Sequence, residues 1–371
     1  MDNLYTASLI QRLNLRDEIF ICGPAPGNTS NPDNHLRVYA NGGILCLLPT
    51  TPDSVIDISS LAYLNKAEES QDENDLRVKY NNSKKIGGRD KVNEKNRERA
   101  DILKNDLWLQ ILCDAIEKHF SKPNVSAEKS SSEEKILAAK RERHNQIAIA
   151  RKHQDFHPDH RGTVVCDLEM TLPKAWYKRG SRSLQIPGKT QAQCDLVTFS
   201  CAEKPWVISI VELKCGKKAC KRPKNGLSAH AKEMALSMEE TRMDQGHIEA
   251  VHNRTDYIKE ILRRLGYMLK AGLLENVPAG LEAQVCELSN SEDREWIQSQ
   301  VRLRSCFLFT GDDDIKDAMA AANLCQKADY LNTHLRDFYY QFQKDPECVD
   351  LSQMQSWDEF KAGMSFPAES S

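Results

Sequence analysis

A glutamate and a lysine stand at the end of an apolar stretch of the sequence. Glu212 and Lys214 follow residues 206–211, whose mostly apolar side chains predict a strand buried on both faces. Because residues two apart on a strand share a face, we expect the two charges to lie side by side. Burying them costs several kcal/mol unless they pair with one another or bind a metal.

A second carboxylate belongs to the preceding apolar segment. Asp195 begins residues 192–200, on the face of Val197 and Phe199. Residues 202–205 are typical of a turn, so we predict an antiparallel hairpin. In that hairpin Asp195 and Glu212 lie at the same end. Two carboxylates and an ammonium group would then converge at one edge of a sheet.

These groups suit a magnesium ion, with Mn²⁺ as a substitute. Mg²⁺ takes oxygen ligands and keeps waters and substrate phosphate in its shell. It lowers the pKa of a bound water and neutralises charge on a phosphodiester. We predict that Asp195, Glu212 and the backbone carbonyl of Leu213 bind the metal. Lys214 would orient the attacking water or stabilise the developing charge.

Seven secondary-structure elements are expected to position these residues. Apolar spacing and turn residues predict helices at 132–152, about 228–274 and about 313–325, and strands at 163–171, 192–200, 206–214 and 305–310. The order from residue 133 is helix, three strands, helix, strand, helix. It predicts an α/β fold in which helices flank a central mixed sheet.

This order resembles the PD-(D/E)XK nuclease superfamily, with its restriction-endonuclease-like α-β-β-β-α-β core. Asp195 lies on the second strand and Glu212-Leu213-Lys214 on the third. Cys194 stands where the family usually has a proline. The resemblance covers about residues 133–325. It implies metal-dependent hydrolysis of nucleic-acid phosphodiester bonds, with DNA as the expected substrate. Asp195 and Glu212 would be metal ligands and Lys214 the catalytic lysine.

The superfamily usually adds an acidic residue upstream, and this sequence offers several. Glu134 and Glu142 lie in the first predicted helix, whereas Asp167 and Glu169 share a face of the first strand. We rank Glu169 first, because a carboxylate near a strand end could reach the same metal. A solvated face of an edge strand explains the strand acids equally well.

A basic stretch follows the third strand and contains no acidic residue. Its members are Lys217, Lys218, Lys221, Arg222, Lys224 and Lys232. A phosphate backbone would be attracted to it. His230, early in the long helix, is expected to face the same site. A solvated loop is an equally good interpretation.

Three histidines close together have the spacing of zinc ligands. They are His153, His157 and His160, but Pro158 breaks any shared helical face between them. We favour exposed loop histidines over a metal site.

Length, charge and composition predict how the chain divides into domains. The chain has 371 residues and a formal net charge of −3, which excludes a wholly basic nucleic-acid coat. Residues 1–65 predict a small β-containing module and residues 66–100 a charged linker or long loop. Residues 101–371 would form the nuclease domain, ending in a helical extension.

The expected location is the cytoplasm, with reduced thiols and no membrane contact. The 12 cysteines include no CxxC pair, and neither a signal peptide nor a membrane-length apolar stretch occurs. The oligomeric state stays open, a homodimer included. Two rival interpretations remain: a catalytically silent nucleic-acid- or protein-binding module on this fold, and an unrelated α/β scaffold in which Glu212 and Lys214 form a structural ion pair.

Overall fold

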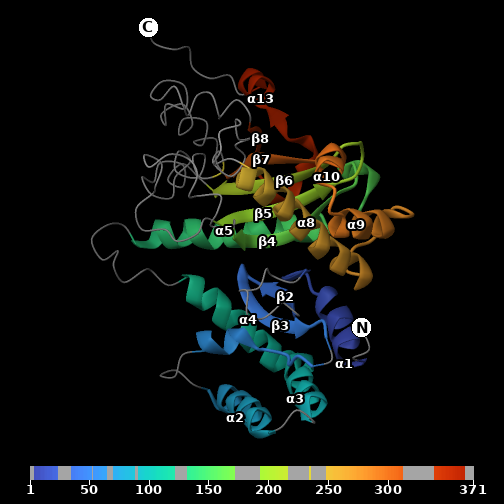
Figure 1. Ribbon diagram of the computed structural model, residues 1–371. Helices are drawn as coiled ribbons and strands as arrows, with labels where there is room; N and C mark the ends of the chain where they lie inside the picture. Colours follow the sequence, from blue (N-terminus) through green and yellow to red (C-terminus); the bar gives the residue numbers. More distant parts are fainter. Residues whose placement is uncertain are drawn as a thin grey trace. The chain divides into compact units, whose positions relative to one another are not determined.

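The computed structural model divides the chain into two compact units (Figure 1). The first unit takes residues 1–151 and 267–273, and the second takes residues 152–266 and 274–371. The structure describes residues 4–23, 35–51, 53–64, 70–87, 91–121, 132–171, 193–215, 234, 248–311 and 338–363. The division falls after Arg151, rather than at residue 65 or 100.

The first unit combines a small sheet with helices. Its antiparallel sheet has the order β1 (Ile19–Cys22), β2 (His35–Ala40), β3 (Gly43–Pro49). The β2–β3 turn is Asn41-Gly42, and both residues have positive φ, as tight hairpin turns require. The helices are α1 (Leu4–Asn14), the short 3-10 helix η1 (Ser59–Tyr63), α2 (Gln71–Lys85), α3 (Val92–Lys104), α4 (Asp106–Ser121) and α5 (Ser132–Lys152).

The prediction of a linker over residues 66–100 is wrong, because α2 and most of α3 lie there. Polar groups hold α3 in place. The Asn96 side chain accepts the Ile56 N–H at 2.8 Å, and buried Arg99 donates to the Ile56 carbonyl. A search for apolar periodicity misses such a helix, because part of its buried face is polar.

The second unit contains a six-stranded mixed sheet of order β4-β5-β6-β7-β8-β9. The strands are β4 (Thr163–Thr171), β5 (Gln193–Ser200), β6 (Trp206–Cys215), β7 (Val301–Thr310), β8 (Tyr339–Gln343) and β9 (Gln355–Ser356). β4, β5 and β6 form an antiparallel meander, β7 and β8 continue parallel to β6, and β9 is antiparallel to β8. The first three predicted strands are confirmed, and the fourth begins earlier, at Val301.

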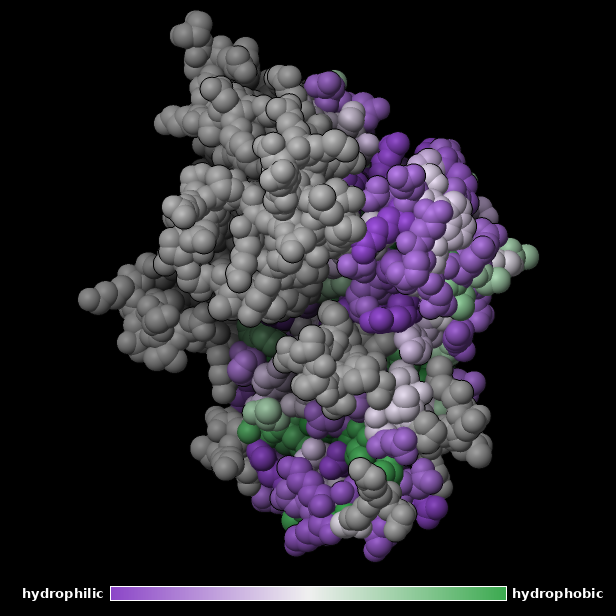
Figure 2. All heavy atoms as spheres, in the orientation of Figure 1, coloured by the Kyte–Doolittle hydropathy of each residue, from purple (hydrophilic) through white to green (hydrophobic). Residues whose placement is uncertain are grey.

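Helices flank this sheet, which confirms the predicted α/β class. They are α8 (Ile248–Lys270), α9 (Leu281–Asn290), α10 (Arg294–Gln300) and α13 (Trp357–Gly363). In Figure 1, α8 lies across one face of the sheet. Asp256 and Arg263 are exposed residues of this helix. Figure 2 shows that hydrophilic side chains prevail on the described surface of this unit in that view. The predicted helix at 313–325 lies outside the described residues.

β6 is the buried centre of the second unit. Every residue of this strand except Val207 is buried, as the apolar run predicts. Within the part of the chain that the structure describes, no helix is long and apolar enough to cross a membrane.

Candidate functional site

β5 and β6 separate at the end where the charged residues lie. Their pairing runs from Ser200↔Val207 to Leu196↔Val211, although β5 begins at Gln193 and β6 ends at Cys215. On either side, β4 stays paired with β5 as far as Gln193, and β7 with β6 as far as Cys215. The sheet therefore opens in its middle. We call the opening between Asp195 and residues 212–214 the strand fork.

Asp195 lies in the strand fork and is half-buried. Its Oδ2 accepts the backbone N–H of Leu213 at 2.6 Å, where a strand partner would otherwise bind. The N–H and C=O of one strand residue point to the same side of the strand. The Leu213 carbonyl therefore also faces β5. The structure thus brings together Asp195 and the predicted backbone ligand.

Glu212 and Lys214 form a buried ion pair beside the strand fork. The Lys214 ammonium donates to Glu212 Oε1, and the side chains of Lys214 and Glu212 are only 4% and 3% exposed. Their partners in the register of β7 are Phe307 and Phe309, so the aromatic rings share their face of the sheet. This apolar wall lowers the local dielectric and strengthens the electrostatic effect of both charges.

The wall continues into an aromatic cluster that covers this end of the sheet. Phe307 stacks with Tyr340 of β8 at a centroid distance of 6.1 Å, and Phe309 stacks with Phe360 of α13 at 6.2 Å. Tyr340 and Phe360 also stack with each other, at 5.2 Å. Water is therefore excluded from one side of the ion pair.

Glu169 lies on β4, next to Asp195 of the neighbouring strand β5. Leu168 pairs with Leu196, and Leu196 pairs with Val211, so these three residues lie side by side on β4, β5 and β6. The next position toward the open end of the sheet is Glu169 on β4, Asp195 on β5 and Glu212 on β6. We call these three carboxylates the acid row. Glu169 is half-buried and has a φ of 51°, a left-handed conformation that costs a non-glycine residue about 1–3 kcal/mol. Such strain is concentrated at functional sites in proteins.

Cys194, the neighbour of Asp195 on β5, feels the charges of the acid row. Burial raises the pKa of its thiol well above the ordinary value, and the charges of Asp195, Glu212 and Glu169 raise it further. The thiol donates to the Met170 carbonyl at 3.4 Å. Its burial and the neighbouring carboxylates therefore disfavour the reactive thiolate form of Cys194.

The donor set of the acid row fits a hard cation. It consists of carboxylate oxygens and one carbonyl, which Mg²⁺ prefers. A carboxylate has about four acceptor positions, so the bonds from Leu213 and Lys214 do not exhaust Asp195 and Glu212. Among the described residues, the acid row is not one of the groups whose ligand atoms already stand close enough to hold an ion, so its ligands would rotate toward a bound ion.

The other predicted upstream acids have different places. Asp167 is fully buried and forms an ion pair with Arg264 of α8, so a solvated edge-strand face is the wrong interpretation for it. Glu142 and Glu134 lie on α5, in the first unit, and the side chain of Glu134 lies outside the described residues. Glu169 alone among these candidates stands at the level of Asp195.

The predicted nucleic-acid-binding residues lie outside the described residues. They are Lys217, Lys218, Lys221, Arg222, Lys224 and His230, together with Lys232. Their role stays a prediction from the sequence.

The three histidines part into two kinds of environment. His153 is fully buried, so an exposed loop histidine is the wrong interpretation for it, whereas the His157 side chain is 46% exposed. His153 and His160 come together with Asp350, which no sequence pattern marks as a possible ligand.

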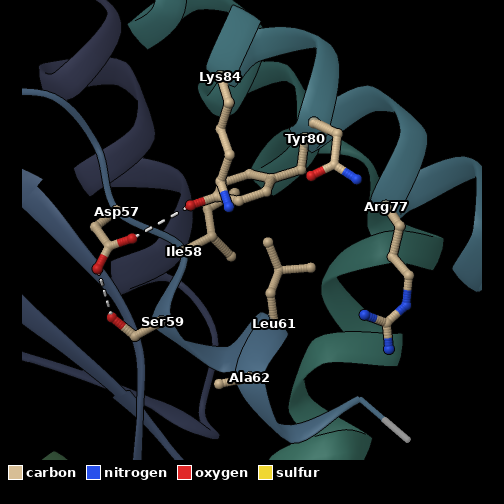
Figure 3. Close-up of a pocket in the computed structure, with 9 residues that line it drawn as sticks. Asp57, Ile58, Ser59, Leu61, Ala62, Arg77, Tyr80 and Lys84 are labelled. Atoms are coloured by element: carbon tan, nitrogen blue, oxygen red, sulfur yellow. Dashed lines mark hydrogen bonds between the residues drawn. The ribbon is translucent and has the colours of Figure 1, made fainter. Parts of the chain in front are cut away.

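The first unit has a cavity of about 550 Å³ between η1 and α2 (Figure 3). Arg77, Tyr80 and Lys84 of α2 line one side, and Asp57 lines the other. The Tyr80 hydroxyl donates to Asp57 Oδ1 at 3.4 Å, and the Lys84 ammonium lies 4.6 Å from the Tyr80 ring centre. The sequence reasoning missed this cavity because it predicted a linker there.

Comparisons of this chain with protein-family models, curated proteins and solved structures give no match.

Proposed function

We propose that the second unit is a metal-dependent nuclease that hydrolyses phosphodiester bonds, with DNA as the expected substrate. The acid row carries the proposal. Three carboxylates stand at one level on three neighbouring strands, beside a buried lysine and at the point where the sheet opens. Neither core packing nor the hairpin requires three carboxylates and a lysine at this place, and burying charged groups costs desolvation free energy.

The order of the elements supports the same function. Among the described elements the chain order is α5, β4, β5, β6, α8, α9, α10 and β7, and β7 lies parallel to β6 beyond the antiparallel meander. This order resembles the α-β-β-β-α-β core of the PD-(D/E)XK superfamily, with α9 and α10 added before the last strand and α5 contributed by the first unit. Asp195 falls on the second strand and Glu212 and Lys214 on the third, as that resemblance requires.

Asp195, Glu212 and the Leu213 carbonyl would hold Mg²⁺ or Mn²⁺, with Glu169 as the upstream acid. The cation would supply a water of lowered pKa and neutralise charge on the phosphodiester. The Leu213 N–H holds the Asp195 carboxylate in the strand fork, so one ligand is oriented before any metal binds. The aromatic cluster keeps water away from the other side of the site.

Lys214 would act on the reacting phosphate. Its ammonium is bonded to Glu212, is buried, and has Phe309 as its neighbour on β7, so its charge is poorly screened. A fixed cation at this place would stabilise the negative charge that develops on the phosphate oxygens. The basic stretch that starts at Lys217 would bind neighbouring phosphates and place the strand.

A nuclease assay on the full-length protein tests this function. Plasmid DNA, linear duplex, single-stranded DNA and RNA are incubated with Mg²⁺, with Mn²⁺ or with EDTA. We expect the wild type to cut at least one of them only when a metal is present. Asp195→Asn should cut at least about 100-fold more slowly, because it loses a charged ligand.

The assay also has results that contradict the proposal. No cleavage of any of the four nucleic acids with either metal would do so, as would cleavage that Asp195→Asn leaves unchanged.

A catalytically silent binding module is the rival function. The ion pair between Lys214 and Glu212 favours this rival, because the ammonium neutralises the Glu212 carboxylate without a metal. Retention of nucleic acid without metal-dependent cleavage would support this rival.

A further inference from the structure

Two distant segments of the second unit are joined just before β4. The Lys152 ammonium donates to the carbonyls of Glu347 and Val349, at 2.6 and 3.0 Å. One residue further along, His153 Nε2 accepts the N–H of Leu351 at 3.2 Å, across 198 residues of sequence. These bonds bring residues 345–353 against the segment that leads into the sheet.

Two histidines and an aspartate meet at this junction. Ligand atoms of His153, His160 and Asp350 all lie within 4.8 Å of one another. His153 is fully buried, and the side chains of His160 and Asp350 are 19% and 15% exposed. The two imidazole rings are 4.8 Å apart between centroids. Polar side chains so well buried need a reason to be together.

Hydrogen bonding does not supply that reason for His160. Its Nδ1 is buried and has no hydrogen-bond partner in the described structure. The nearest carboxylate oxygen, Asp350 Oδ1, is 3.7 Å away, too far for a hydrogen bond. Zinc ligands at about 2.0–2.2 Å from the ion stand about 3.3–3.6 Å apart in a tetrahedral site. The observed spacing is therefore close to that of two ligands of one ion.

Asp350 is held as an ionised, oriented carboxylate. It accepts the Ser352 N–H at 3.0 Å, the Ser352 hydroxyl at 2.7 Å and the Gln353 amide at 2.9 Å. Burial alone would raise its pKa, but the Ser352 bonds and the nearby histidines outweigh burial and lower it. Bonds of this kind commonly orient metal ligands.

We propose that His153, His160 and Asp350 bind a zinc ion, with water in the fourth position. Two imidazoles and one carboxylate form a donor set typical of Zn²⁺ rather than Mg²⁺. The His153 Nε2 lone pair, which accepts the long hydrogen bond from the Leu351 N–H, would bind the ion instead. It would clamp residues 345–353 to the segment before β4, and so stabilise the folded chain. This site is independent of the proposed nuclease function.

Zinc titration of the full-length protein tests the site. Chelator-treated protein is titrated with ZnCl₂ by calorimetry, and bound zinc is counted after dialysis. His160→Ala and Asp350→Asn remove ligands, and Asn can still accept the bonds from Ser352. The matched control is His157→Ala, on the same segment but with an exposed side chain. Asp195→Asn shows whether the acid row contributes zinc binding of its own.

We expect the wild type, His157→Ala and Asp195→Asn to bind the same zinc ion tightly. His160→Ala and Asp350→Asn should bind it at least about 100-fold more weakly. Zinc should raise the melting temperature of the first three proteins but not of the other two. Equal zinc affinity and equal melting shifts in all five proteins would overturn the proposal. Circular dichroism identifies any variant that is unfolded, and Asp350→Asn decides the outcome if His160→Ala fails to fold.

Discussion

Two buried ion pairs lie on the same face of the sheet, but one joins a helix to a strand and the other joins two residues of one strand. Arg264 of α8 pairs with Asp167 of β4, 97 residues away, and both side chains are 1% exposed. Lys214 pairs with Glu212, two residues away on the same strand. The first pair ties a helix to the sheet. The second connects no separate elements.

This difference indicates which pair is structural. Burying an ion pair costs desolvation energy that the attraction only partly returns, so a buried pair needs a further role. Asp167 pairs with Val197 just after an irregularity in the β4–β5 register, and Val197 pairs with Ile210, so β5 and β6 are still joined at this level. Glu212 stands one residue beyond the last β5–β6 pair, at the strand fork. Position relative to the strand fork, rather than burial, distinguishes the two.

Arg264→Met should have the largest effect on stability. It leaves the Asp167 carboxylate buried without its cation, which should lower the free energy of unfolding by about 3–5 kcal/mol. Mg²⁺ should not restore this loss, because the strands around Asp167 are closed. Urea unfolding with and without Mg²⁺ measures both effects.

Arg263→Met is the matched control, since that side chain is 57% exposed on the same helix. It should change stability by less than about 0.5 kcal/mol. If the two arginine variants were equally stable, the Asp167–Arg264 pair would not be structural.

Lys214→Met should lose up to about 3 kcal/mol in metal-free buffer, since Glu212 then lacks its counter-charge. Methionine keeps most of the volume of the lysine stem against Phe309. Mg²⁺ should restore part of the loss by replacing the ammonium group. The same urea experiment measures this recovery, and an identical loss with and without Mg²⁺ would place Glu212 out of reach of a metal.

Asp195→Asn should remove the response to metal at a small cost in stability. Asparagine retains an oxygen that can accept the Leu213 N–H. Mg²⁺ at ten times its Kd should stabilise the wild type by about 1.4 kcal/mol and the variant much less. Melting curves with and without Mg²⁺ check this, with the exposed carboxylate variant Asp256→Asn as control. Equal metal shifts in all three proteins would contradict the site.

Charge reversal at Lys217 and Lys221 should have the smallest effect and act on binding alone. If both contact phosphates, the slope of log affinity against log salt should fall by about 1.8. All DNA sequences should be affected alike, because phosphate contacts carry no sequence information. Fluorescence anisotropy at several salt concentrations measures this slope. An unchanged slope would assign the basic stretch to solubility.

The sequence predicted those strands of the second unit that are marked by runs of apolar residues. The bounds of β4, β5 and β6 follow from apolar runs, and the turn between β5 and β6 puts Asp195 and Glu212 at one end. The strand fork itself was not predictable, because it depends on where pairing stops. The positive φ of Glu169 likewise depends on the neighbouring strands.

The sequence failed where polar groups do the packing. Arg99 holds α3 to the backbone of Ile56, so no apolar stripe marks that helix. Asp350 reaches His160 only through the fold of the second unit. Spacing along the chain showed the histidines but had no means of showing their third partner.

Single-turnover cleavage by Lys214→Met tests the central claim most directly. The rate of DNA cleavage at saturating Mg²⁺ is measured for the wild type, Lys214→Met and Lys204→Met. Lys204 lies in the turn at the other end of the hairpin, where its ammonium is 3.5 Å from the Trp206 ring centre. We expect Lys214→Met to be slower by about 100- to 1,000-fold, because a preorganised charge at the reacting phosphate is lost. Lys204→Met should cut like the wild type. Wild-type cleavage by folded Lys214→Met would show that the strand fork is not the catalytic site.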